Sequence, residues 1–85
     1  MKELFKKYEI ATETANEIDA AWETDPENET LEKAFDTAYQ AQYNAFIELV
    51  NEIVTFTNGQ IDKKTAATMI RTKYNELKNL IDRLA

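Results

Sequence analysis

Apolar residues recur along this chain at alternating spacings of four and three residues, in three separate series. The first series contains Leu4, Tyr8, Ala11, Ala15, Ile18 and Trp22. The second contains Leu31, Phe35, Ala38, Ala45 and Leu49, with the polar Gln42 in one slot. The third contains Ala67, Ile70, Tyr74, Leu77, Ile81 and Leu84. Because an α-helix has 3.6 residues per turn, each series lies along one side of a helix, and the pattern predicts three amphipathic helices.

A proline marks the first predicted break. Pro26 is disfavoured inside a helix but fits a first turn, and Asp25, Thr24 or Thr30 can cap the helix that follows. The first helix is therefore predicted over about residues 2–24. The second begins between residues 26 and 31, and we place it at about 26–58.

The only glycine marks the second predicted break. Gly59 follows Asn58 where a left-handed residue can end the second helix, and Asp62 can cap the third. The third helix is predicted over about 62–84. The polar Gln42 is expected either to be buried and hydrogen-bonded or to lie at the rim of the core.

The turn positions predict how the helices pair. A hairpin turning at residues 25–27 brings Tyr8 near Ala45 and Ile18 near Phe35. The second helix also carries a neighbouring apolar stripe, formed by Tyr39, Tyr43, Phe46, Val50 and Ile53. A turn at 59–60 would lay the third helix along this stripe, with Leu77 near Tyr43. The chain is thus predicted to be all-α, a single domain over 1–85 folded as an antiparallel up-down-up three-helix bundle.

The composition excludes most catalytic chemistry. The chain has no histidine and no cysteine, so it offers neither an imidazole base nor a thiol nucleophile. A single glycine cannot form a phosphate-binding loop. We therefore expect no enzyme activity, no catalytic residue, no metal site and no cofactor.

Charge is unevenly distributed along the chain. The net charge is −6, and residues 1–30 hold nine acidic and three basic residues, whereas residues 59–85 hold six basic and three acidic ones. No run approaches the ~20 apolar residues of a membrane span. The charged stretch after Met1 lacks the apolar segment of a secretory signal, so a cytoplasmic protein is expected.

Acidic side chains define one candidate face, formed by Glu9, Glu13, Glu17 and Asp19. These residues lie outside the apolar series, so solvent is their expected environment. If they are free and share one exposed face, they could imitate nucleic acid and inhibit a protein that has a basic cleft. This is the alternative functional hypothesis, and pairing of these carboxylates with the third helix would argue against it.

Basic side chains define a second candidate feature, a strip formed by Lys64, Arg71 and Lys78. Such a strip could bind an anion or nucleic acid, or its aliphatic stems could cover the core while the charged ends pair with neighbouring acids. Because the chain is acidic overall, direct binding of nucleic acid is not expected.

Aromatic residues define the candidate partner surface, formed by Tyr39, Tyr43, Phe5 and Phe56. The third helix could cover the two tyrosines, but an aromatic strip on the longest helix is also typical of a binding surface. The leading hypothesis is therefore a small non-enzymatic interaction module. Its partner would be another protein or a second copy of the chain.

Overall fold

The computed structural model describes residues 1–84, all of whose regular structure is helical. The helices are α1 (Lys2–Thr24), α2 (Glu29–Phe56), α3 (Lys63–Thr72) and α4 (Tyr74–Leu84). The all-α prediction is confirmed, but the prediction of a three-helix bundle is wrong because the expected third helix is two helices. Ala85, the last residue of the predicted domain, lies outside the described residues.

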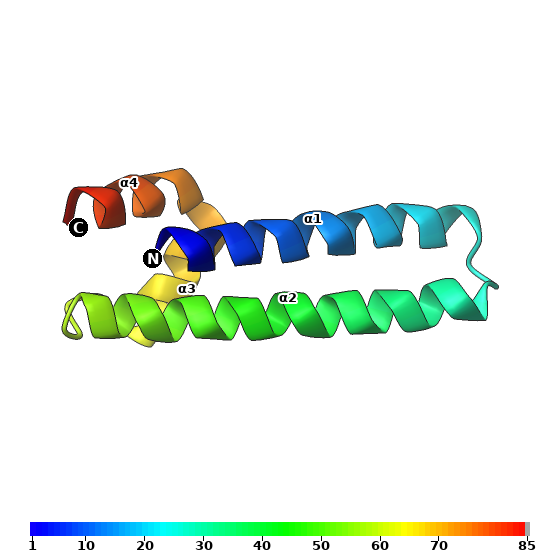
Figure 1. The fold of residues 1–85 in the computed structure, drawn as a ribbon, viewed down its shortest axis with the longest axis horizontal. Coiled ribbons are helices and arrows are strands. Elements are labelled where there is room, and N and C mark those ends of the chain that lie inside the picture. The colour runs from blue at the N-terminus through cyan, green and yellow to red at the C-terminus, as the bar shows by residue number, and fades with distance from the viewer. Residues whose placement is uncertain (85) are drawn as a thin grey trace.

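Helices α1 and α2 form a long antiparallel hairpin (Figure 1). Asn28, rather than Asp25, Thr24 or Thr30, caps α2, and its side-chain oxygen accepts hydrogen bonds from the backbone N–H groups of Thr30 and Leu31. Pro26 therefore lies in the turn, and α2 begins three residues later than predicted. The predicted bounds of α1 are confirmed.

Side-chain contacts confirm the predicted pairing of this hairpin to within about one helical turn. The rings of Trp22 and Phe35 lie 6.1 Å apart near the turn, and those of Tyr8 and Phe46 lie 6.1 Å apart further along. Between them the Gln42 amide donates to the Thr12 hydroxyl over 3.0 Å. The polar slot of the second series therefore holds a half-buried hydrogen bond between the two helices.

The loop from α2 to α3 contains two left-handed residues, Asn58 (φ 53°) and Gly59 (φ 80°). The Gly59 N–H donates to the Val54 carbonyl over 2.9 Å, which closes the end of α2. Asp62 then caps α3 as predicted, and the Thr65 N–H that it accepts lowers the pKa of its carboxyl group.

We expect Gly59→Ala to lower the free energy of unfolding by about 1 kcal/mol. A Cβ at Gly59 would meet no atom within 4 Å, so the cost is the left-handed backbone alone. Asn58→Gly, at the other left-handed position, should be neutral or slightly stabilising. Urea denaturation of both variants tests this, and a stabilised Gly59→Ala protein would contradict it.

A one-residue corner separates α3 from α4. Lys73 leaves the helical conformation (φ −138°, ψ 43°), and the hydroxyls of Thr68 and Thr72 donate to carbonyls four residues back, which favours bending. After the corner, α4 turns back toward the end of the hairpin that holds the N-terminus (Figure 1). Helix α4 therefore does not run along α2 toward Tyr43. The predicted pairing of Leu77 with Tyr43 is wrong.

The core gathers at that end of the hairpin. We call it the proximal core, and its buried members are Phe5, Leu49, Val50, Ile53, Ala66, Ile70, Leu77 and Ile81. The rest of the hairpin, residues 12–43, we call the distal hairpin, and only Ala15 and Ala38 are buried within it. Its larger apolar residues Ile18, Trp22, Leu31 and Phe35 are only partly buried. The distal hairpin therefore has two helical layers where the proximal end has more.

Candidate functional site

Two exposed tyrosines lie on α2 where it extends beyond α3. Tyr39 and Tyr43 keep 52% and 58% of their surface exposed, although both belong to the apolar stripe that continues into the proximal core. The Tyr39 ring is held by the Phe35 ring, whose centroid lies 4.7 Å away. The predicted third helix would have covered these two tyrosines, but α4 turns away from them, so the exposure that a partner surface requires is present.

A shallow groove of about 300 Å³ joins these tyrosines to the end of α3. Its lining residues are Tyr8, Tyr39, Gln42, Tyr43, Phe46 and Arg71. The Arg71 guanidinium lies 4.9 Å from the centre of the Phe46 ring, so a cation borders an otherwise aromatic surface. The sequence marked Arg71 only as part of a basic strip. Its place beside Phe46 follows from the position of α3 on α2.

The other two members of the predicted partner surface are elsewhere. Phe5 is buried in the proximal core, where its ring and that of Tyr74 form an edge-to-face pair with centroids 5.8 Å apart. Its predicted place on a partner surface is therefore wrong. Phe56 is partly exposed and is the last residue of α2, about 25 Å along the helix axis from Tyr39. The four residues therefore form no common surface.

The predicted basic strip is interrupted by the corner at Lys73. Lys64 and Arg71 belong to α3, whereas Lys78 belongs to α4 and pairs with Glu9 on α1 over 3.1 Å. The Lys78 ammonium also lies 5.7 Å from the centre of the Tyr74 ring. Lys78 and Arg71 thus cover aromatic side chains, which matches the alternative interpretation of the strip.

The four residues of the predicted acidic face do not form one free, exposed face. Glu9 accepts a hydrogen bond from the Tyr74 hydroxyl over 2.7 Å in addition to its ion pair with Lys78. Glu13 and Glu17 are exposed, whereas Asp19 is half-buried. Since two residues are about 200° apart around a helix, Glu17 and Asp19 point to nearly opposite sides of α1.

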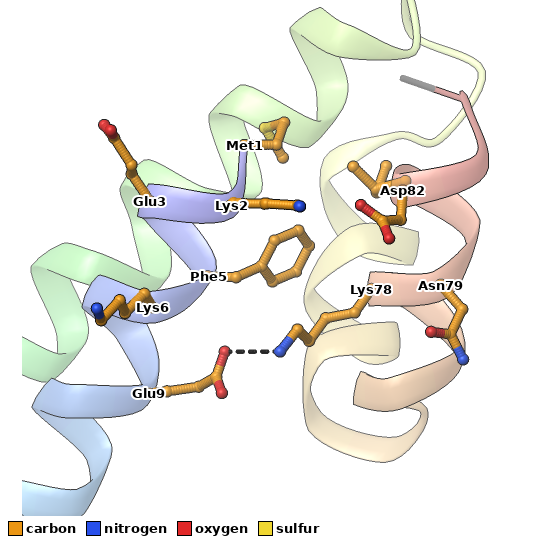
Figure 2. Close-up of a pocket in the computed structure, with 10 residues that line it drawn as sticks. Met1, Lys2, Glu3, Phe5, Lys6, Glu9, Lys78, Asn79 and Asp82 are labelled. Carbon is orange, nitrogen blue, oxygen red and sulfur yellow. Dashed lines mark hydrogen bonds and ion pairs between the residues drawn. The ribbon is translucent and has the colours of Figure 1, made fainter.

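A second groove, of about 760 Å³, lies between the start of α1 and α4 (Figure 2). Phe5 and Ile81 are the buried apolar residues among those that line it. Lys2 and Asp82 lie on its opposite walls, and the Lys78–Glu9 pair crosses one end (Figure 2). Positive and negative groups alternate around this groove, so it offers no concentration of one charge for an anion or a cation.

Two titratable groups beside this groove, Glu9 and Tyr74, have shifted pKa values. The Tyr74 hydroxyl, together with the Lys78 ammonium, holds the pKa of Glu9 below its ordinary value of 4.5, against the opposing effect of partial burial. Burial raises the pKa of Tyr74 above its usual range, and the bond to Glu9 adds to this rise. Tyr74 and Lys78 belong to α4 and Glu9 belongs to α1, so these bonds attach α4 to α1. The Tyr74 hydroxyl also lies 3.3 Å from the carbonyl oxygen of Phe5 on α1.

We expect Tyr74→Phe to lower the free energy of unfolding by about 1 kcal/mol and to raise the pKa of Glu9 toward 4.5. A carboxyl group with a lowered pKa stabilises the fold above its unfolded pKa and loses that contribution as the pH falls through its folded value. The variant should therefore lose less stability than the parent below about pH 4.5.

NMR titration of the Glu9 carboxyl, with urea denaturation at pH 3 and pH 7, measures both effects. Tyr43→Phe is the matched control because the Tyr43 hydroxyl has no hydrogen-bond partner among the residues that the structure describes. Equal pKa values for Glu9 in the parent and in Tyr74→Phe would show that the hydroxyl does not hold the carboxylate.

Within residues 1–84, no three acidic side chains converge closely enough to hold a metal ion. In the same residues, no helix combines the length and the apolar character needed to cross a membrane. Comparisons with protein-family models, with curated proteins and with solved structures each find no match, so a functional proposal rests on this chain's own residues.

Proposed function

We propose that this protein is a small, non-enzymatic interaction module that presents the distal hairpin to a protein partner. The observation that carries the proposal is the exposure of Tyr39 and Tyr43 on a stretch of α2 that neither α3 nor α4 covers. Tyrosine is enriched at the centres of protein interfaces, where its ring is buried and its hydroxyl finds a partner. Both tyrosines stand on a helix, so they are held in place before binding.

The surroundings of the two tyrosines support the same function. Arg71 borders them on the side of α3, and the half-buried Phe35 continues the aromatic surface toward the turn. An interface of this kind has an apolar centre and a charged rim. The Gln42–Thr12 hydrogen bond fixes α1 against α2 beneath the surface.

Imitation of nucleic acid gains less support from the geometry. That function needs Glu9, Glu13, Glu17 and Asp19 free on one face. Glu9 is held by Tyr74 and Lys78, and Asp19 lies across the helix from Glu17. These placements favour the interaction module over the acidic inhibitor.

Differential capture tests the proposed function. The tagged 85-residue chain serves as bait in an extract of its source cells, beside a Tyr39→Ala/Tyr43→Ala variant and an Ile10→Ala control. Ile10 is equally exposed but lies about 200° around α1 from the packed Tyr8. We expect a protein that the parent and the control retain and the tyrosine variant loses. Equal retention by all three baits, or no retained protein, would contradict the proposal.

A further inference from the structure

We propose that the partner of the distal hairpin is a second copy of this chain, bound as an antiparallel two-fold dimer. This inference rests on the proposed function, because it names the partner of the same surface. At the proximal end α3 and α4 cover the hairpin, and side chains such as Leu49 and Ile53 are fully buried. In the distal hairpin no third layer is present within residues 1–84, and Trp22, Leu31 and Phe35 remain half-buried.

The shape of the chain determines how two copies can meet. The helix pair α3–α4 lies over one end of the molecule, which is 46 Å long and 20 Å wide. Two distal hairpins can therefore pack face to face only if the copies run antiparallel, with the two α3–α4 pairs at opposite ends. Each distal hairpin then occupies the space beyond the other copy's α3. The α1 and α2 segments of both copies together make a four-helix cross-section.

Charge complementarity favours the same arrangement. The turn of the hairpin carries four exposed acids, Glu23, Asp25, Glu27 and Glu29, and no basic residue occurs between Lys7 and Lys33. The last turn of α1 has no basic residue, although the C-terminal end of a helix favours a cation.

The matching cations lie at the corner between α3 and α4. Arg71 and Lys73 are exposed there, and the corner borders the uncovered part of the hairpin (Figure 1). In the antiparallel dimer the acidic turn of each copy lies beside the basic corner of the other, so the contact occurs twice. A parallel arrangement would instead place like charges together and make the α3–α4 pairs collide.

The expected dimer is of modest affinity. A standard interface buries about 800 Å² per partner, and here only the distal half of one face is free. Tyr39 and Tyr43 form its centre, and charged residues form its rim. Because rim charges are screened by salt, we expect the dimer to weaken as the ionic strength rises.

Sedimentation equilibrium of the pure 85-residue chain, from about 1 to about 300 µM, measures the association. We expect a monomer–dimer equilibrium that Tyr39→Ala/Tyr43→Ala weakens by about ten-fold or more and that Ile10→Ala leaves unchanged. A parent protein that stays monomeric over this range overturns the proposal. A dimer that is insensitive to the tyrosine substitutions overturns it as well.

A charge-swap experiment tests the antiparallel arrangement directly. One variant carries Arg71→Glu and Lys73→Glu, and a second carries Glu23→Lys and Glu27→Lys. The first variant alone has like charges at both contacts, and in the second the turn has no net charge left to attract its own basic corner, so each should be monomeric. In an equimolar mixture the acidic turn of the first variant meets the basic corner of the second, and the introduced lysines meet the introduced glutamates, so a heterodimer should form. Formation of that heterodimer also shows that both variants are folded.

The outcomes separate this inference from the proposed function. A mixture that remains monomeric overturns the antiparallel dimer. In that case the extract experiment can still identify a different protein that depends on Tyr39 and Tyr43. If the extract experiment retains only untagged copies of this chain, and only with intact tyrosines, the dimer is supported as the function of the surface.

Discussion

Replacing Leu77 with alanine should lower the free energy of unfolding by about 2–5 kcal/mol. Leu77 lies in α4 with 0% of its surface exposed, inside the proximal core. Domains of this size are stable by only about 4–13 kcal/mol, so the substitution removes a large share of the total. Thermal unfolding should shift downward by about 10 °C or more, since each kcal/mol corresponds to several degrees in a small domain.

Leu84→Ala is the matched control for this prediction. Leu84 lies in the same helix and belongs to the same sequence pattern, but it keeps 58% of its surface exposed. Its replacement should cost less than about 1 kcal/mol. Equal losses from the two variants, measured by urea denaturation at one protein concentration, would show that α4 does not pack as described.

The hairpin of α1 and α2 could be predicted from the sequence because its signals are local. Pro26 interrupts the helical pattern, Asn58 and Gly59 adopt the left-handed conformation that ends α2, and Asp62 caps α3. Turn positions and apolar spacing then determine which side chains meet across the hairpin. Even here, the sequence offered three candidate residues to cap α2, and the structure uses a different residue, Asn28.

The corner at Lys73 could not be predicted because its only local signal, the bending favoured by Thr68 and Thr72, is weak. No glycine or proline occurs after Gly59, and the apolar pattern from Ala67 to Leu84 continues through the corner without a change of phase. Packing decides the bend. With α4 folded back, Tyr74 reaches two partners on α1, and Leu77 joins a core shared by α1, α2 and α3.

The candidate site depends on the same corner. The sequence marked Tyr39 and Tyr43 but allowed the third helix to cover them, and only the fold-back of α4 leaves them exposed. The sequence likewise grouped Phe5 and Phe56 with these tyrosines, because it does not show which aromatic side chains a neighbouring helix buries. A side chain's position in the helical pattern predicts the side of the helix on which it lies, whereas its exposure depends on whether another helix packs against that side.

The second large effect is expected at Ile53, which lies in α2 with 0% of its surface exposed. Ile53→Ala should lower the free energy of unfolding by about 2–5 kcal/mol. Ile47→Ala is the matched control on the same helix, because Ile47 is 38% exposed and should cost less than about 1 kcal/mol. Urea denaturation followed by circular dichroism measures both losses at a fixed protein concentration.

Trp22 extends this prediction to the distal hairpin. It is the only tryptophan of the chain and contacts Phe35, which lies 18 residues, or about 27 Å along α2, from Ile53. In the distal hairpin only Ala15 and Ala38 are fully buried and the larger apolar side chains stay partly exposed, so its two helices bury too little apolar surface to stay folded by themselves. The fluorescence transition of Trp22 should therefore shift with Ile53→Ala by the same amount as the circular dichroism transition. If fluorescence instead kept its original midpoint, the distal hairpin would be an independent folding unit, and its uncovered surface would need no partner for stability.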